Sequence, residues 1–397
     1  MSLPDDEHPG ARIAHHRKRS GLTQRGLAQK IPYSYSLLTQ VESGHKPASP
    51  DLVAAVARAL CIDVTALTGQ PYVTELQQDR LAALVRPIRE ALDLYDLGAD
   101  PAIKPRPTPQ LIAAAQTLCE QVRATKLHDA ALHLPGTMAE ITTAAYQSPS
   151  SELWAALSST YRTAHDLAVK LGYYDLSTVA LDRMDWAASR ASDPLLSAVR
   201  QYMRALVYFR EGEYTIGQRL VASGQGLLGQ APQTRERQAV AGQLHLGASI
   251  IAARAEDEGA VATHLAEAKS YADRVGEATD VHWLSFGPTN VRLHTVSAHV
   301  EMRHYGEALR EAAKVRIPQD WPASRAAHFY VDQARAQMEA GRTEAALKSI
   351  VTARKLAPQQ TRYHSGARET IRSLIHLSRR TPDTLDHLGG SLALSPQ

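Results

Sequence analysis

Apolar residues recur at helical spacing through the first seventy positions of the chain. Leu27, Ala28 and Ile31 fall on one face of a helix, and Leu38 and Val41 share a face of the next one. Five helical segments follow from this spacing, over residues 10–21, 24–30, 35–43, 51–60 and 63–69.

Residues at the ends of these segments support the same boundaries. Thr23 and Ser34 are N-caps, because a hydroxyl there accepts a hydrogen bond from the free amides of the first turn. Gly21 and Gly44 stand where helices end in the left-handed conformation. Pro32 disfavours the helical conformation of the residue before it, which ends the second helix near residue 30.

The middle of the chain contains a long predicted helix followed by a proline-rich segment. Residues 74–98 read as one long helix, whereas residues 99–110, "ADPAIKPRPTPQ", contain four prolines. Proline at this density prevents a helix and predicts a semi-rigid linker or a long loop.

Beyond the linker, helical segments recur in pairs with a loose period. The breaks within pairs align with spacings of 40, 45, 46 and 38 residues, and small residues follow five positions later. This self-similarity predicts a helical repeat array. The aligned break residues are Gly172, Gly212, Asp257, Arg303 and Gly341, and the small residues are Ser177, Gly217, Ala262, Ala308 and Ala346.

Composition agrees with an all-α chain. Aromatic residues make up 6% of the 397 residues, and β-branched and aromatic runs of the kind a sheet needs are scarce. Cys61 and Cys119 belong to no metal-binding or redox pattern, which favours a reducing compartment. Because no signal peptide or apolar run of membrane-spanning length stands out, we expect a cytoplasmic protein without membrane contact.

Positive charge gathers near the N-terminus, although the formal net charge is only +3. Residues 11–30 carry six Lys or Arg and no Asp or Glu. Alone, such a run is typical of a solvated basic helix; beside a helix-turn-helix pattern it indicates a surface that binds phosphates.

The stretch "GLTQRGLAQKIPYSYSLLTQVESGHKPASPDLVAAVARALCIDVTALTG", residues 21–69, resembles the DNA-binding domain of the XRE (lambda-repressor-like) family. The resemblance is free of gaps from Leu22 to Gly44 and covers about 60 residues. It implies a five-helix domain whose third helix enters the major groove of DNA. It also implies binding to a palindromic double-stranded operator as a homodimer, because one domain reads a half-site.

Carried over by position, the resemblance implies three sets of residues. The implied base contacts are Tyr35, Ser36, Leu37, Thr39 and Gln40. The implied phosphate contacts are Thr23, Gln24, Arg25, Ser34, Ser43, His45 and Lys46. Arg17 and Glu42 match a structural ion pair between the first and third helices. Gln40 is the leading base reader, because an amide pairs bidentately with adenine N6 and N7.

The turn before the third helix departs from the family pattern. Pro32 replaces the usual left-handed glycine, so the turn needs different dihedral angles. Tyr33 replaces a small apolar residue, and we expect its ring to cover the domain core with its hydroxyl near the phosphates.

The last repeat, residues 330–358, resembles a tetratricopeptide (TPR) repeat, and the other units are degenerate. We therefore expect a right-handed TPR-like α-solenoid over residues 109–397, responsible for sensing and dimerisation. An XRE domain followed by such an array resembles peptide-pheromone-receptor regulators of Gram-positive bacteria and actinobacteria. By analogy, the solenoid groove binds a peptide, a small ligand or a protein partner.

Polar positions on the predicted first helices of the pairs are candidates for this groove. Residues 290, 294, 297 and 301 form a polar stripe between two apolar stripes. The candidates are Asn290, His294, Arg204, Tyr208 and Tyr161. Internal hydrogen bonds or packing between helices explain the same pattern. We weigh this alternative equally with ligand binding for Asn290, and above ligand binding for Tyr161 and Tyr208.

Enzymatic function finds no support in the sequence, and neither does a cofactor. No P-loop, nucleophile elbow or zinc-protease motif is present. His294, His299 and His304 are five residues apart, and that spacing points them in different directions on a helix, so no metal site is expected.

The sequence therefore predicts a tail at 1–9, a DNA-binding domain at 10–70, a connecting helix and linker at 71–108, and the repeats. The expected function is a sequence-specific transcription regulator under effector control, and DNA binding makes a nucleoid-associated location the expectation. The alternative is a TPR interaction scaffold in which DNA binding is incidental or lost.

Overall fold

The computed structural model describes residues 8–68 and 75–377. Within these residues it is built from helices, and the only strand-like pairing is a single bridge between Ala278 and Phe286. The N-terminal domain consists of α1 (Pro9–Arg19), α2 (Gln24–Ala28), α3 (Tyr35–Glu42), α4 (Pro50–Leu60) and α5 (Val64–Thr68). The all-α prediction is confirmed for the described residues.

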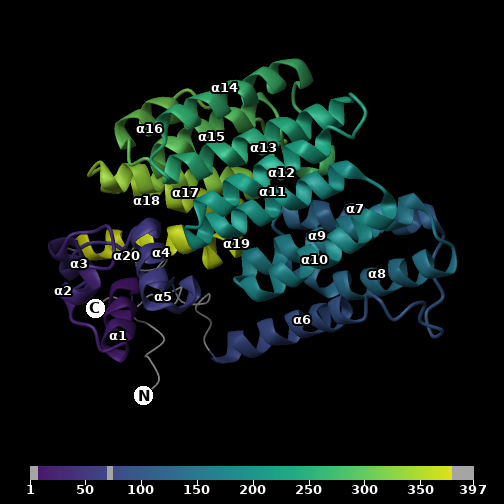
Figure 1. Cartoon of the computed structure of the whole chain (residues 1–397), viewed down its shortest axis with the longest axis horizontal. Coiled ribbons are helices and arrows are strands. Elements are labelled where there is room, and N and C mark those ends of the chain that lie inside the picture. The colour runs from purple at the N-terminus through teal and green to yellow at the C-terminus, as the bar shows by residue number, and fades with distance from the viewer. Residues whose placement is uncertain (1–7, 69–74, 378–397) are drawn as a thin grey trace.

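The remaining helices form the repeat region (Figure 1). In chain order they are α6 (Glu75–Asp93), α7 (Thr108–Arg123), α8 (Leu127–Gln147), α9 (Ser151–Leu171), α10 (Tyr174–Ala191), α11 (Pro194–Glu211), α12 (Tyr214–Leu228), α13 (Arg235–Arg254), α14 (Glu258–Val275), the 3-10 turn η1 (Val281–Trp283), α15 (Pro288–Glu301), α16 (Tyr305–Ala312), α17 (Ala323–Glu339), α18 (Thr343–Leu356), α19 (Pro358–Tyr363) and α20 (Ser365–Leu377).

The N-terminal domain closes around a small apolar core. Ile13, Leu27, Leu38, Val41 and Leu67 are fully buried in it. The predicted caps form, with the Thr23 hydroxyl accepting from the Gly26 amide and the Ser34 hydroxyl from the Leu37 amide. Helix α2 ends at Ala28, two residues earlier than predicted, and bends at 31–33 lead to α3.

The predicted tail is shorter than the sequence suggested. Residues 1–7 lie outside the described residues, but His8 caps α1 and Pro9 begins it. His8 Nδ1 lies 3.2 Å from the Ala11 amide, which satisfies one free donor of the first turn.

Helix α6 and the proline-rich segment belong to the repeat region rather than to a free linker. Val85, Ile88 and Leu92 of α6 enter the same apolar core as α8 and α10. The proline-rich segment forms a loop, as predicted, but Arg106 fastens it to Glu140 of α8 at 2.7 Å. This loop therefore contributes to packing.

Five helix pairs follow one another as predicted: α9–α10, α11–α12, α13–α14, α15–α16 and α17–α18. Four of the five aligned break residues adopt the left-handed conformation, with φ of 83° at Gly172, 75° at Gly212, 62° at Arg303 and 74° at Gly341. Of the aligned small residues, Ser177, Ala308 and Ala346 are fully buried, which lets the paired helices approach closely.

In the third pair the predicted register is wrong by one residue. Glu256 has the left-handed φ of 59°, while the side chain of Asp257 accepts from the Ala260 amide as the N-cap of α14. Consequently Val261 is buried where Ala262 was expected, and Ala262 is exposed. A capping carboxylate fixed the register here, against the spacing of the other pairs.

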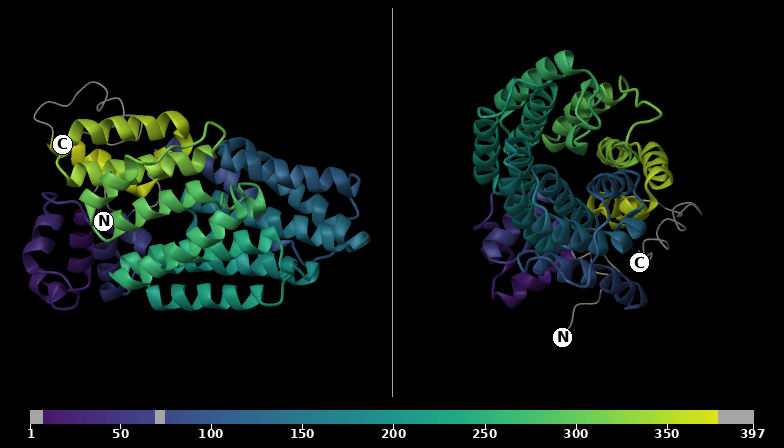
Figure 2. Two further views of the ribbon diagram at one scale, coloured as in Figure 1. Left: turned by 90° about the horizontal axis from the view of Figure 1, so that it is seen from above. Right: turned by 90° about the vertical axis from the view of Figure 1, so that its right-hand side faces the viewer.

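The helix pairs curve around until the last helices meet the first ones, which the right-hand view of Figure 2 shows as a ring. Contacts of α17 with α7 and of α19 with α9 close this ring. Gln359 accepts from the Leu127 amide at 2.9 Å, and Gln360 joins Lys170 to the Ser324 carbonyl. None of the described helices is long and apolar enough to span a membrane.

Candidate nucleic-acid interface

Helix α3 is held by its inner face and leaves its outer face open. Leu38 and Val41 are fully buried, whereas Tyr35 is 44% exposed. Ser36 and Gln40 are also exposed, and they lie one turn apart with 3.4 Å between Gln40 Nε2 and Ser36 Oγ. This places most of the predicted base-contact set on one solvent-facing side of the helix.

Two members of that set are less available for contacts with bases. Leu37 is partly buried against the domain core. The Thr39 hydroxyl donates to the Tyr35 carbonyl at 2.9 Å, so its oxygen lone pairs, rather than its proton, face outward. The guanidinium group of Arg25 also lies over the Tyr35 ring in a cation–π contact, with 5.5 Å between its carbon and the ring centroid.

The predicted phosphate contacts lie at the start of α2 and at both ends of α3. Thr23, Arg25 and Ser34 are exposed, and the two hydroxyls accept from backbone amides as caps, which leaves their protons free to donate. Past the helix, Ser43, His45 and Lys46 are exposed. Ser43 Oγ lies 2.7 Å from His45 Nδ1 and donates to the Gln40 carbonyl.

Arg17 and Glu42 form the ion pair that the resemblance implies. Both guanidinium contacts to the carboxylate are short, at 2.7 and 2.8 Å, and both side chains are buried. Arg17 also donates to the Leu22 carbonyl at 2.8 Å. The pair thus ties α1, α3 and the intervening turn together.

Gln24 completes this network instead of pointing freely outward. Its Nε2 donates to Glu42 Oε2 at 2.7 Å. The amide nitrogen keeps a second N–H, which is a donor of the kind that a phosphate oxygen accepts from. The Gln24 side chain thus supports the ion pair in this structure, and its phosphate contact stays a prediction.

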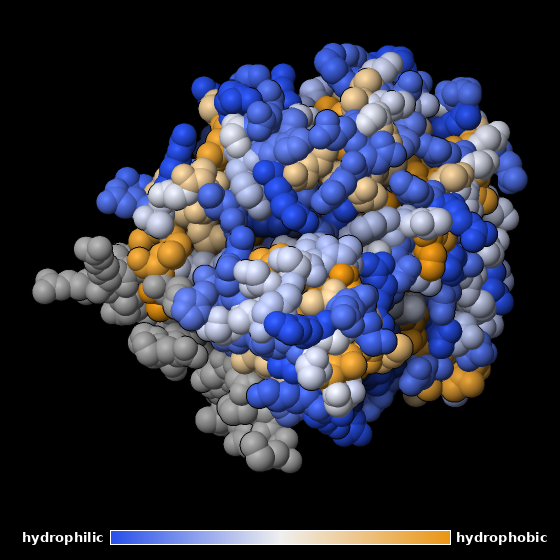
Figure 3. Space-filling model, turned by 60° about the vertical axis from the view of Figure 1, so that its left-hand side comes forward, coloured by the Kyte–Doolittle hydropathy of each residue, from blue (hydrophilic) through white to orange (hydrophobic). Residues whose placement is uncertain are grey.

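The opposite side of the N-terminal domain docks on the repeat region. Asp51 of α4 lies 3.2 Å from Arg254 and accepts from the Tyr214 hydroxyl at 2.9 Å. Arg58 donates to the Gly212 carbonyl at 2.7 Å. These contacts leave α3 uncovered. In the view of Figure 3 hydrophilic residues predominate, and hydrophobic ones gather only in small patches.

Tyr33 takes part in this docking, which corrects one expectation. Its ring packs on the domain core as predicted. Its hydroxyl, however, lies beside the guanidinium of Arg303, not near the DNA-facing side. Burial raises the pKa of Tyr33, so the phenol is neutral there. The unusual turn thus contributes to the contact between the two parts.

No sequence signal pointed to the docking residues. Asp51, Tyr214 and Arg254 come from separate helices, and nothing in their local sequence indicates that they meet. An acidic residue in the first turn of α4 reads as ordinary helix chemistry.

The predicted ligand-groove residues do not form one open groove. Asn290 and Tyr161 have no exposed surface, and His294 is 5% exposed. Asn290 donates to Gln243 and accepts from Arg325 at 2.9 Å. For these residues the groove assignment is wrong, because internal hydrogen bonds and packing occupy them.

Arg204 and Tyr208 differ, since both are partly exposed on α11. Arg204 contacts Gln201 of its own helix at 3.0 Å. Neither residue is joined to Asn290 or His294 by any contact within the described part of the chain, so the predicted five do not act together.

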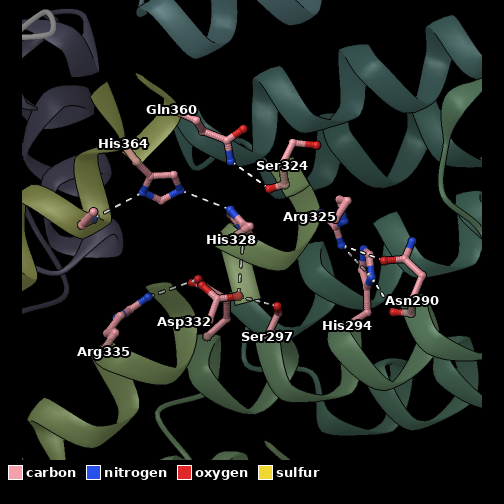
Figure 4. Close-up of polar contacts among 12 residues, drawn as sticks. Asn290, His294, Ser297, Ser324, Arg325, His328, Asp332, Arg335, Gln360 and His364 are labelled. Carbon is pink, nitrogen blue, oxygen red and sulfur yellow. Dashed lines mark hydrogen bonds and ion pairs between the residues drawn. The ribbon is translucent and has the colours of Figure 1, made fainter. Parts of the chain in front are cut away.

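A different set of polar residues lines the inside of the ring. Figure 4 shows His364 beside His328, with Asp332 and Ser297 continuing the series and Arg325 directed at His294. His364 and His328 approach to 3.2 Å, and Ser297 donates to Asp332 at 2.5 Å. The His328 side chain is 40% exposed although helices surround it, so water reaches this interior.

Comparisons with known proteins give a family model for the N-terminal domain and a curated relative. Residues 10–68 match the family model described as "Helix-turn-helix domain". A curated relative from Cereibacter sphaeroides, named "Propionyl-CoA carboxylase regulator", is 34% identical over 74 residues. That match covers 18% of this chain and 16% of the relative. No solved structure matches the chain. The family model thus ends before the repeat region.

Proposed function

We propose that the protein is a sequence-specific DNA-binding transcription regulator whose repeat region senses an effector and controls operator binding. The observation that carries the first half is the outward face of α3, where Tyr35, Ser36 and Gln40 stand exposed above the buried Leu38 and Val41. The helix-turn-helix match and the name of the relative support the same assignment.

Binding as a homodimer belongs to this proposal. One domain of this kind reads a half-site, and two such domains contact half-sites about 34 Å apart on the same side of the duplex. Because the N-terminal domain is docked on the repeats, the arrangement of two repeat regions sets the separation of the two α3 helices.

The same docking supports the proposal of effector control. Arg254 contacts Asp51 on one side and Glu301 at 2.8 Å on the other, and Arg335 reaches Glu301 from α17 at 3.2 Å. Polar contacts therefore run from the DNA-binding domain into the interior of the ring. A ligand that shifts α15 or α17 changes the docked state, and with it the spacing of the α3 helices.

The decisive experiment is operator selection from a random DNA library with the purified full-length protein. Titrations at several salt concentrations then compare the selected operator with a scrambled duplex. We expect a specificity ratio of roughly 10³ or more that persists at physiological salt. Sequence-independent binding that disappears at moderate salt would overturn the proposal and favour the interaction scaffold.

Gln40→Ala tests the assignment of α3. Loss of a bidentate contact should relax discrimination at one base pair by about 1–3 kcal/mol while other positions keep theirs. Gln29→Ala is the matched control, because Gln29 is an exposed glutamine that follows α2, outside α3. Equal weakening on every sequence would place the base reading elsewhere.

A further inference from the structure

A cleft opens in the repeat region where α7, α9, the start of α11 and η1 meet. Its volume is about 420 Å³, within the range of small-molecule sites. Among the described residues that line it, Glu152 and Asp193 are acidic and none is a lysine or an arginine. Its apolar walls are formed by Ile112, Ala115, Ala155, Ala156 and Leu196, together with the indole of Trp283.

Neither acidic residue of the cleft has an ion-pair partner in the described part of the chain. Glu152 lies in the first turn of α9, and its side chain is exposed. Asp193 is the N-cap of α11, where its Oδ1 accepts from the Leu195 amide at 2.8 Å and from the Leu196 amide at 3.4 Å. Its Oδ2 is bonded to none of the described residues. Both carboxylates can therefore accept hydrogen bonds from a ligand.

The two helix ends beside these carboxylates do not reverse the sign of the charge. Acidic residues are common at the start of a helix, because a helix N-terminus carries roughly half a positive charge. Two N-termini against two carboxylates leave about one negative charge at the cleft. His282 adds no positive charge, because burial, first of all, lowers the pKa of its imidazole despite the nearby carboxylates of Asp193 and Glu236.

The ring of Trp283 lacks the cation that covers several other aromatic rings of the repeat region. Arg190 lies over Trp186 with 3.9 Å between the guanidinium carbon and the ring centroid, and Arg183 lies over Tyr95 at 3.8 Å. Trp283 is partly exposed, and no arginine or lysine in the described residues lies over its ring. Since aromatic faces attract cations, most strongly when shielded from water, the Trp283 ring can receive one from the cleft.

An unusual backbone holds Trp283 at the cleft. His282 and Trp283 have left-handed φ values of 41° and 52°, which non-glycine residues seldom adopt unless the surrounding structure enforces them. Arg162 supplies one such restraint, because its Nη2 donates to the Trp283 carbonyl at 3.3 Å. Asp166 Oδ2 lies 3.8 Å from Arg162 Nε. A carboxylate thus offsets the charge of Arg162, which holds the turn without making the cleft positive.

We propose that this cleft binds a small organic cation, a protonated amine on a short apolar body. Its ammonium group is directed at the carboxylates of Glu152 and Asp193 and at the ring of Trp283, and its body lies along the alanines of α7 and α9. An ammonium group only donates hydrogen bonds, and a carboxylate is the acceptor that binds it most strongly. The role of this ligand as the effector rests on the proposed function, whereas its binding does not.

Three probes that share one body test the site without DNA. Phenylbutylamine is a cation at neutral pH, phenylbutanol is neutral and phenylbutanoate is an anion. Isothermal titration calorimetry with the full-length protein should show the amine binding one to one, roughly tenfold or more tighter than the alcohol, because a hydrogen bond to a charged group contributes at least that factor. The carboxylate should bind more weakly than the alcohol, because the cleft repels it.

Charge-removing variants test the acidic part of the site. Glu152→Gln and Asp193→Asn each remove one charge and keep the shape of the side chain, and asparagine serves as well as aspartate at an N-cap. Each should weaken amine binding roughly tenfold and leave alcohol binding unchanged, which also shows that the cleft is intact. Glu344→Gln is the matched control, at an exposed glutamate in the first turn of α18, and should leave all three affinities unchanged.

Two further variants test the aromatic and apolar parts. Trp283→Leu should weaken the amine roughly threefold to tenfold more than it weakens the alcohol, because leucine offers no aromatic face to a cation. Ala155→Phe should block the amine and the alcohol alike by filling the apolar part of the cleft.

Equal affinities for the amine and the alcohol, tightest binding of the carboxylate, or amine binding that survives Glu152→Gln and Asp193→Asn combined would overturn the proposal. Operator affinity measured with and without the amine is a separate readout. An amine that binds the cleft but leaves operator affinity unchanged contradicts the effector role, while the cation site stands.

Discussion

Asp51 of the helix-turn-helix domain and Arg254 of the repeat region form an ion pair with 3.2 Å between Oδ1 and Nε. Each side chain is about a tenth exposed, so the pair is shielded from water. Arg254 is shared with Glu301, whose pKa is lowered by Arg254 and Arg335 although burial opposes the shift. The pair links the DNA-binding domain to charges inside the ring.

Replacing Asp51 should release the DNA-binding domain from the repeats. Asp51→Ala removes the partner of Arg254 and the acceptor of the Tyr214 hydroxyl, and breaking a buried pair costs about 3 kcal/mol. Faster hydrogen exchange in α4 and a larger radius of gyration by small-angle scattering should report the release. Asp175→Ala, at an exposed pair within the repeat region, should change neither quantity.

Gly212→Ala should have a similar effect through packing alone. Gly212 has a left-handed φ of 75°, and an added Cβ would lie 2.8 Å from the Cβ of Ala54 in α4. Gly341→Ala is a close control, because Gly341 has a φ of 74° and no atom within 4 Å of a new Cβ. Both variants should lose about 1 kcal/mol from the backbone.

Only Gly212→Ala should also expose the docking surface to limited proteolysis. Ala54→Gly in the same chain should restore protection, because it removes the atom that the new Cβ meets. Equal protease sensitivity of the two alanine variants would show that docking does not depend on this approach.

The docking surface illustrates what the sequence could predict and what it could not. Local chemistry sufficed for the caps at Thr23 and Ser34 and for the left-handed glycines, since these depend on residues a few positions away. The meeting of Asp51 with Arg254 depends on the accumulated curvature of several helix pairs. Spacing alone does not encode that curvature, and it also misplaced the break at Asp257, where a side-chain cap decided the register.

Glu42→Ala should destabilise the helix-turn-helix domain strongly. Glu42 accepts two hydrogen bonds from Arg17 and one from Gln24, so its loss leaves a buried guanidinium unpaired. The expected loss is about 3–5 kcal/mol in the free energy of unfolding of this domain, measured by urea denaturation followed by hydrogen exchange. Glu90→Ala, at an exposed i,i+4 pair of α6, should cost less than about 1 kcal/mol.

Pairing Glu42→Leu with Arg17→Met should recover part of this loss, because an apolar pair of similar volume carries no unpaired charge. If the single and double variants were equally unstable, packing rather than the ion pair would hold α1 against α3.

The ligand groove was predicted poorly for a related reason. A polar stripe on a helix between two apolar stripes indicates burial between neighbours, but not which neighbour satisfies it. Asn290 turned out to bond with Gln243 and Arg325, and both partners lie on other helices.

Acid should destabilise the repeat region through His165. Burial, the largest cause, lowers the pKa of His165 to about 4, with the charge of Arg210 adding to the shift and that of Asp166 opposing it. The imidazole is held neutral, with Nδ1 3.1 Å from the Ser177 carbonyl. An unfolded chain has a histidine pKa near 6.5, so below that value the unfolded state takes up a proton that the native state does not.

Stability contributed by the neutral imidazole is therefore present above pH 6.5 and is lost as the pH falls toward 4. Between pH 7.5 and pH 5 the loss from this one group should be about 2 kcal/mol. Urea denaturation at both pH values measures this loss in the free energy of unfolding. The loss should be about 2 kcal/mol smaller in His165→Gln than in the parent protein, since glutamine does not titrate. His133→Gln, at an exposed histidine, should lose as much as the parent. Identical losses in all three proteins would mean that the His165 site admits a charged imidazole.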